Sequence, residues 1–237
     1  MKISKLSKAI RKMLPLQYCG AVIVAAGNAS RMGGIDKVMA QLQGEPMIVR
    51  TVRAFQNCDV IKEIVIVTRE NLIPEITRLC SGFDKVSTVV PGGQDRQGSV
   101  EAGLKALSKK VKLAAIQDGA RPLISQEVIE RTVRAANTYG AAAPAIPVKD
   151  TIKIAEGGVV KTTPDRSTLR AVQTPQVFDL DLLQGALQKA RTDKAAITDD
   201  CSAVERIGFG VKIVEGDERN IKITTPIDLR IAEFLIE

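Results

Sequence analysis

The sequence lacks histidine and tryptophan, and aromatic residues make up only 3% of its 237 positions. Without histidine, mechanisms that need a Ser-His pair, a Cys-His pair or a histidine base are excluded. Few aromatic side chains also means few stacking platforms for single-stranded nucleic acid, although the formal charge is +7. We therefore expect catalysis by lysine, arginine, carboxylates and metal on a small phosphorylated substrate, with no nucleic-acid partner.

Other absences bear on the compartment. The four cysteines form no C-x-x-C pair, and no apolar run is long enough for a signal core or a membrane span. Residues 1–16 carry five cations and no acid. We expect a cytoplasmic protein with a solvated, basic N-terminal extension over 1–17 that makes no membrane contact, followed by one domain over 18–237.

Apolar strands alternate with amphipathic helices through the first part of the chain. The expected strands cover 20–26, 63–68, 85–90, 112–117 and 141–147, and the expected helices cover 46–58, 71–80, 96–107 and 126–139. Further helices are expected near 179–191, 199–207 and 226–237, with a strand over 210–216. This alternation predicts an α/β fold with a twisted, mainly parallel sheet flanked by helices.

The alternation stops over about 148–170. There the segments TIKIA and VVKTT, joined through Glu156, Gly157 and Gly158, are typical of a β-hairpin. A protruding β-arm inside a compact domain suggests exchange with a second subunit, so we expect a homodimer formed through the arm.

The loop AAGNASRMGGIDK, over 25–37, follows the first strand directly. Backbone N–H groups at Gly27 and two later glycines can cradle phosphate oxygens, and Arg31 and Lys37 add two positive charges. The spacing is neither G-x-G-x-x-G nor a P-loop. A plain glycine turn with two surface cations would show the same spacing.

A second loop, over 91–103, reads PGGQDRQGSVEAG. Gly92 and Gly93 follow a strand, and Arg96 and Ser99 lie near the start of the next helix. The loop could hold a base or a ribose, and a plain turn with a helix cap fits equally well.

The segment IQDGARP places Asp118 at the carboxyl end of an apolar strand, the edge where open α/β sheets bind ligands. An aspartate there can hold Mg²⁺ against a triphosphate, with Arg121 one turn away. An aspartate that caps a helix is the alternative.

Taken together, these segments resemble the 2-C-methyl-D-erythritol 4-phosphate cytidylyltransferases of the non-mevalonate isoprenoid pathway. The similarity runs in order from about residue 20 to residue 237. It is carried by AAGNASRMG with the following lysine, GGQDRQGSVEAGL, DGARP, PVKDTIK, PDRSTL, QTPQVF, TDDCSAVE and NIKITTPIDL.

The resemblance implies a Rossmann-like nucleotidyltransferase fold. It also implies transfer of CMP from CTP to 2-C-methyl-D-erythritol 4-phosphate, giving 4-diphosphocytidyl-2-C-methyl-D-erythritol and pyrophosphate. By similarity, Arg31, Lys37 and Lys222 would be the catalytic cations.

The remaining site residues also follow from the resemblance. Asp118 would bind Mg²⁺ or another divalent cation, with Asn220 as a second ligand, and Thr151 and Arg166 would bind the methylerythritol phosphate across the dimer interface. The residues expected to bind CTP are Ala26, Gly27, Gly92, Gly93, Ser99 and Arg121.

Among the departures from the family pattern, two stand directly before predicted site residues. Asp36 stands where a proline is usual before the loop lysine, and Gln117 stands where a histidine is usual before the metal aspartate. The carboxylate of Asp36 could weaken nucleotide affinity. Two alternatives remain: a ribitol 5-phosphate or other polyol phosphate cytidylyltransferase, and a catalytically silent nucleotide-binding protein.

Overall fold

The computed structural model describes residues 15–27 and 37–236. Residues 1–14, which make up most of the predicted extension, and residues 28–36 lie outside this description. Among the described residues, no helix is both long and apolar enough to cross a membrane.

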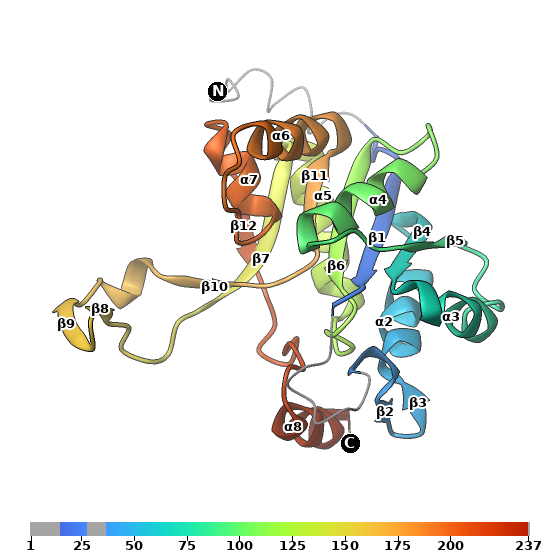
Figure 1. Cartoon of the computed structure of the whole chain (residues 1–237), viewed down its shortest axis with the longest axis horizontal. Helices are drawn as coiled ribbons and strands as arrows, with labels where there is room; N and C mark the ends of the chain where they lie inside the picture. The colour runs from blue at the N-terminus through green and yellow to red at the C-terminus, as the bar shows by residue number, and fades with distance from the viewer. Residues whose placement is uncertain (1–14, 28–36, 237) are drawn as a thin grey trace.

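The apolar run at the start of the chain forms β1 (Cys19–Ala25), in the middle of an eight-stranded sheet (Figure 1). β1 pairs in parallel with β4 (Ile61–Thr68) on one side and β6 (Leu113–Asp118) on the other. Beyond β4 lies β5 (Val86–Pro91), also parallel. Because six of the seven β1 residues are buried, an almost wholly apolar strand is required there.

The other half of the sheet contains an antiparallel strand that the sequence analysis missed. β11 (Gln176–Asp179) lies between β6 and β7 (Ala141–Pro147) and is antiparallel to both. β12 (Lys212–Glu215) pairs in parallel with β7. The prediction of a mainly parallel sheet is confirmed, with β11 as a reversed strand inside it.

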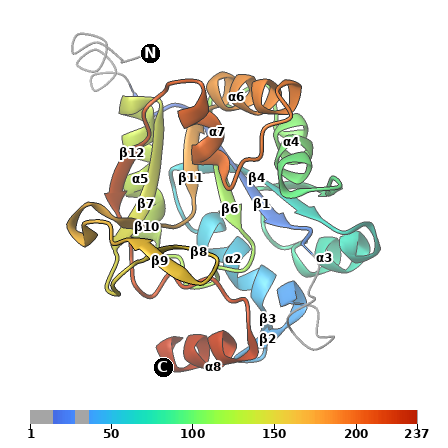
Figure 2. The ribbon, with the colours of Figure 1, turned by 60° about the vertical axis from the view of Figure 1, so that its left-hand side comes forward.

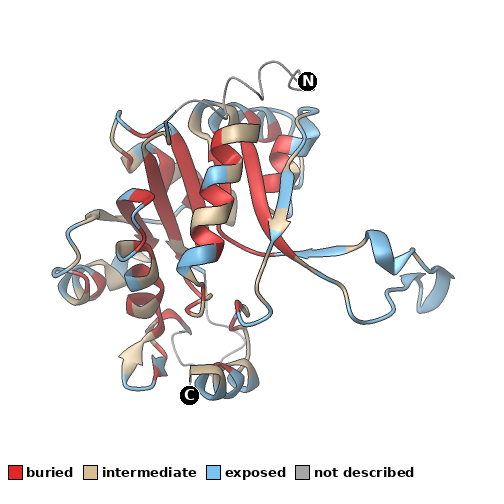
Figure 3. Ribbon diagram, turned by 180° about the vertical axis from the view of Figure 1, so that it is seen from behind, coloured by how far each residue is buried: buried red, intermediate tan, exposed pale blue. Residues whose placement is uncertain are grey.

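Helices cover both faces of the sheet, which gives three layers (Figures 1 and 2). One apolar cluster packs the sheet against α2 (Met47–Gln56), α3 (Ile73–Leu79) and α5 (Gln126–Tyr139). A second cluster packs the opposite face against α4 (Arg96–Ala106), α6 (Leu180–Thr192) and α7 (Asp200–Arg206). Figure 3 shows the buried strands between these layers.

A smaller apolar cluster lies at the carboxyl edge of the sheet. It includes Leu42, Ile223 and Ala232, and so joins β2 (Gln41–Leu42) to the closing helix α8 (Pro226–Ile236). β2 pairs with β3 (Glu45–Pro46) in a short hairpin that the sequence analysis also missed. This cluster fixes the start of α8 beside the loops that follow the parallel strands.

The predicted arm leaves the body after β7 (Figure 1). It carries the antiparallel pair β8 (Ile154–Glu156) and β9 (Val159–Thr162), and it returns through β10 (Arg170–Val172), which pairs with β7. Gly157 and Gly158 adopt positive φ, as a tight hairpin turn requires. The hairpin strands are exposed throughout (Figure 3).

Strand order places a crevice at the carboxyl edge. The chain runs from β1 outward to β4 and β5, and then returns to the other side of β1 to form β6. The strand order therefore reverses between β1, which is followed by β4 on one side, and β6, which is followed by β7 on the other, and such a reversal is where open α/β sheets bind ligands.

Close packing of α4 on the sheet generates a stability prediction. A Cβ atom at Gly103 would lie 2.2 Å from Cγ1 of Val22 and 2.8 Å from Cγ2 of Val67. We expect Gly103→Ala to lower the free energy of unfolding by about 1–2 kcal/mol through overpacking, measured by urea denaturation.

Gly185→Ala is the matched control, because Gly185 lies in α6 with nothing within 4 Å of the added methyl group. There the better helix propensity of alanine should raise the free energy of unfolding by roughly 0.5–1 kcal/mol. Equal effects of the two substitutions would contradict the packing described for α4.

Candidate active site

A pocket of about 340 Å³ opens at the crevice between β1 and β6. Its walls are the end of β1, the loop before α4, the residues after β6, and the segment that precedes α8. The lining residues are Val24, Ala25, Ala26, Gly27, Val38, Gly93, Gln94, Asp95, Arg96, Ser99, Asp118, Gly119, Ala120 and Lys222.

Asp118 is the carboxylate at the centre of this pocket. It ends β6 and is 9% exposed. Its Oδ2 lies 2.9 Å from Nζ of Lys222 and 3.4 Å from Nε of Arg121. Burial alone would raise the pKa of this carboxyl, but the two cations outweigh burial and lower the pKa below its ordinary value. Asp118 is therefore ionised at neutral pH.

Lys222 and Arg121 are held by the segment that leads into α8. The N–H of Ile223 donates to the carbonyl of Ala120 (2.9 Å), which pins this segment against the loop after β6. Nη1 of Arg121 donates to the carbonyl of Asn220 (2.7 Å). Two cations from separate parts of the chain thus converge on one carboxylate.

Asn220 lies behind this cluster rather than in the pocket lining. Its side chain is fully buried, and its Nδ2 donates to the carbonyl of Thr174 (3.0 Å). Its Oδ1 is buried without a hydrogen-bond partner among the described residues. Thr174 also accepts, through Oγ1, the backbone N–H of Asp118 (3.1 Å), so one threonine links Asn220 to Asp118.

The loop before α4 forms the second wall. A Cβ atom at Gly92 would lie only 2.4 Å from Cβ of Ala26, so glycine is required for this loop to approach the end of β1. Oγ of Ser99 accepts the N–H of Gly93 (3.2 Å) and donates to the carbonyl of Asp95 (2.9 Å). Ser99 thereby fixes the conformation of the loop.

An ion pair on this wall had no assigned role in the sequence analysis. Nη2 of Arg96, which lines the pocket, lies 2.7 Å from Oδ2 of Asp200, which is wholly buried at the start of α7. The segment TDDCSAVE that holds Asp200 contributed to the family resemblance, and an aspartate beside a helix start would by itself indicate only a cap.

Most of the predicted site residues lie in the pocket lining or in contact with it. Asp118 and Lys222 line the pocket in contact with each other, and Arg121 contacts the same carboxylate from outside the lining. The other predicted residues that line the pocket are Ala26, Gly27, Gly93 and Ser99, and Gly92 packs against Ala26.

Thr151 and Arg166 are exposed on the arm and do not line this pocket. Nη1 of Arg166 donates to the carbonyl of Lys149 (2.6 Å), within the arm itself. Arg31, the side chain of Lys37 and Asp36 lie outside the described residues.

The donor set suits a divalent cation that is shared with phosphates. The described residues contain no cluster of three side chains that could hold a metal ion by themselves. Mg²⁺ is commonly bound by one or two carboxylates together with substrate phosphates. A single ionised aspartate facing a pocket among cations matches that mode of binding.

Comparisons with known proteins agree on one family. Residues 19–237 match the sequence profile of 2-C-methyl-D-erythritol 4-phosphate cytidylyltransferase. Proteins of that name are 45% identical over 225 residues in Caldanaerobacter subterraneus subsp. tengcongensis and 46% identical over 219 residues in Symbiobacterium thermophilum. Both comparisons cover 91% of this chain. They cover 97% of the Caldanaerobacter protein and 92% of the Symbiobacterium protein.

Solved structures show the same similarity. The 4-diphosphocytidyl-2C-methyl-D-erythritol synthase of Anaerococcus prevotii superposes with a TM-score of 0.85 at 30% identity, covering 94% of this chain and 99% of that one. The 2-C-methyl-D-erythritol 4-phosphate cytidylyltransferase of Thermus thermophilus gives a TM-score of 0.78 at 32% identity, covering 92% and 98%.

The charge cluster predicts a pH dependence at Asp118. Because its folded-state pKa is lowered, the ionised carboxylate contributes stability above its unfolded pKa of about 3.9, and this contribution is lost as pH falls. We expect Lys222→Met to raise the pKa of Asp118, measured by ¹³C NMR of the carboxyl carbon between roughly pH 3 and pH 6.

The control is Lys189→Met, which removes a lysine paired with the distant Asp193 (2.6 Å). It should leave the titration of Asp118 unchanged. A pKa for Asp118 that is the same in the unsubstituted protein and in Lys222→Met would show that Lys222 does not stabilise the carboxylate.

Proposed function

The chain belongs to the 2-C-methyl-D-erythritol 4-phosphate cytidylyltransferase family, and we propose that the pocket at β1 and β6 is where it performs the family's reaction. The protein is a cytidylyltransferase that transfers CMP from CTP to 2-C-methyl-D-erythritol 4-phosphate and releases pyrophosphate. The observation that carries this site assignment is the convergence of Lys222 and Arg121 on Asp118 at the strand-order reversal.

The reaction suits a site without histidine. The acceptor phosphate is already an anion, so its oxygen can attack the α-phosphorus of CTP without a general base. The protein has to bring two anions together in line and stabilise the charge that develops between them. Cations fixed before the substrates arrive serve that purpose, since little reorganisation is then needed during the reaction.

Lys222 and Arg121 contribute differently to charge stabilisation because they lie at different depths in the site. Lys222 is partly exposed at the pocket, where it can reach a phosphate oxygen, while Arg121 is mostly buried and neutralises Asp118 from behind. Arg31 and Lys37, which follow β1 in the sequence, are proposed from the family resemblance to contact the triphosphate. Lys222 would then stabilise the transition state.

We propose that Mg²⁺ binds at the carboxylate of Asp118. Lys222 and Arg121 both approach its Oδ2, so Oδ1 is the oxygen proposed for Mg²⁺. The bound ion would supply charge neutralisation and orientation of the triphosphate. Asn220 is proposed as a weaker second ligand, supported by its buried Oδ1 without a hydrogen-bond partner.

Two features of the arm support the proposal that the active site is shared between the subunits of a homodimer. It exposes apolar side chains at Ile154, Val159 and Val160, each more than half exposed, as expected of a surface that another subunit covers. A depression of about 440 Å³ at its base brings together Arg166 and Arg170. We propose that Thr151 and Arg166 of one subunit bind the acceptor phosphate in the pocket of its partner.

We also propose that the protein is located in the cytoplasm. All four cysteines are buried as free thiols, which fits a reducing environment and therefore the cytoplasm.

The activity is tested by pyrophosphate release with CTP, Mg²⁺ and 2-C-methyl-D-erythritol 4-phosphate, with ribitol 5-phosphate and UTP as alternative substrates. We expect release only with CTP and the methylerythritol substrate. In Lys222→Ala, kcat should fall by about 10²–10³-fold, the loss typical of one preorganised donor. Lys189→Ala, far from the pocket, is the control.

Release with ribitol 5-phosphate alone would move the protein to the polyol phosphate cytidylyltransferases. CTP binding without turnover on any acceptor would favour the silent nucleotide-binding protein. A near-normal kcat in Lys222→Ala would remove Lys222 from the proposed mechanism.

Complementation tests the shared site. Arg166→Ala lacks the acceptor residue and Asp118→Ala lacks the metal residue, so each homodimer should be nearly inactive. After mixing and subunit exchange, half of the dimers are mixed and each holds one intact site, which predicts about a quarter of full activity. Activity that stays at the level of the separate variants, although mixed dimers form, would contradict a site shared through the arm.

A further inference from the structure

The Arg96–Asp200 pair is a candidate for a role in nucleotide binding. Arg96 lies in the first turn of α4, its side chain is 33% exposed, and it lines the pocket beside Gly93 and Ser99. Asp200, its partner, is fully buried. One edge of the guanidinium is thus tied to a carboxylate that no solvent reaches, while the rest of the group faces the pocket.

Asp200 is itself held rigidly from β11. Oε1 of Gln176 accepts the N–H groups of Asp200 and Cys201 (3.1 Å each), and Nε2 of Gln176 donates to Oδ2 of Asp199 (2.7 Å). Asp199 in turn caps α7 through the N–H of Ser202 (2.8 Å). The carboxylate of Asp200 therefore has a fixed position, and it fixes the guanidinium of Arg96.

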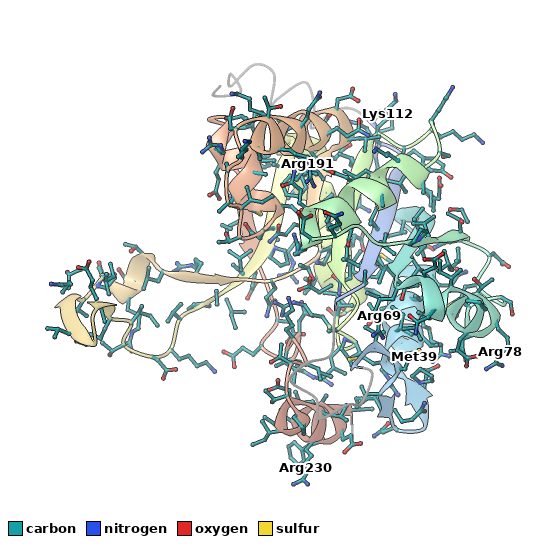
Figure 4. The ribbon with its side chains drawn as sticks, viewed as in Figure 1. Met39, Arg69, Arg78, Lys112, Arg191 and Arg230 are labelled. Atoms are coloured by element: carbon teal, nitrogen blue, oxygen red, sulfur yellow. The ribbon has the colours of Figure 1, made fainter. Side chains whose placement is uncertain are left out.

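α4 is anchored independently on its other side. Arg191 of α6, labelled in Figure 4, contacts Glu101 of α4 (3.0 Å) and Asp95 (3.5 Å), the residue that caps the start of α4. Gln97 donates to the carbonyl of Leu187 (2.9 Å) in the same helix α6. Because these contacts already join α4 to its neighbour, the buried pair is not required simply to attach the helix.

Charge balance indicates which part of a nucleotide the pair would face. Asp118 is matched by two cations, Lys222 and Arg121, so that cluster keeps a net positive charge for phosphates. Arg96 is ion-paired with Asp200, and the charges of Asp118 and Asp199 also act on it, so its positive charge is already balanced. A guanidinium has five N–H donors, and those not used by Asp200 suit uncharged acceptors such as ribose hydroxyls and base carbonyls.

We propose that Asp200 is a positioning residue that holds Arg96 against the nucleoside half of CTP. The pair then contributes to nucleotide affinity rather than to the transfer step. This inference rests on the proposed function, because it takes CTP to be the occupant of the pocket.

The test uses full-length Asp200→Asn and Arg96→Lys. Asparagine has the shape of aspartate but cannot hold the guanidinium as a carboxylate does, and lysine keeps the charge but loses the planar fork. We expect both variants to raise the dissociation constants of CTP and of CMP by the same factor, roughly 10-fold or more, measured by calorimetry. The KM for methylerythritol phosphate should not change, and kcat should change less than about threefold.

Asp193→Asn is the matched control, since Asp193 pairs with Arg206 of α7 (3.0 Å) far from the pocket. It should leave both dissociation constants unchanged. If Asp200→Asn does not fold, Arg96→Lys carries the test alone, because its change is made at the edge of the pocket.

Two results would overturn the proposal. Unchanged nucleotide affinity with a lowered melting temperature would make the pair only a structural tie between α4 and α7. Weaker binding of CTP with unchanged binding of CMP would assign Arg96 to the β- and γ-phosphates instead. Failure of the proposed function is separate, because the unsubstituted protein would then release no pyrophosphate in any of these experiments.

Discussion

The site depends on a short buried segment, residues 173–176, which connects β10 to β11 beside the carboxyl end of β6. Thr174 accepts the N–H of Asp118 and, through its carbonyl, binds the side chain of Asn220. Two residues later, Gln176 holds the backbone of Asp200. Both carboxylates that pair with cations at the pocket are therefore positioned by one buried segment, and its burial makes each hydrogen bond costly to break.

The two carboxylates serve different purposes because their partners differ. Asp118 has two cations and faces the pocket, so it can remain ionised and still leave positive charge for a triphosphate. Asp200 has one cation and no exposed surface, and burial raises the pKa of its carboxyl while Arg96 opposes the rise. The pocket is thus positive on one wall and nearly neutral on the other, as a nucleotide with a charged and an uncharged half requires.

Much of this could be predicted from sequence because parallel strands and their carboxyl ends leave a periodic signal. The alternation predicted the sheet and its helices, and the apolar strand before Asp118 placed that residue at the ligand edge. β11 was missed because QTPQVF is short and contains a proline, so it lacks the alternation typical of a strand. The pairing of Arg96 with Asp200 was missed because 104 residues separate them, and only the fold, in which α6 packs against both α4 and α7, brings them together.

Thr151 and Arg166 lie on the arm rather than at the pocket, so their proposed role in binding the acceptor requires a second subunit. A crystal structure with CTP and Mg²⁺ would show whether the pocket is the active site. We expect the metal and triphosphate at Asp118 and Lys222, with the nucleoside against Ser99 and Arg96. A triphosphate bound at Arg96, or a nucleotide outside the crevice between β1 and β6, would contradict it.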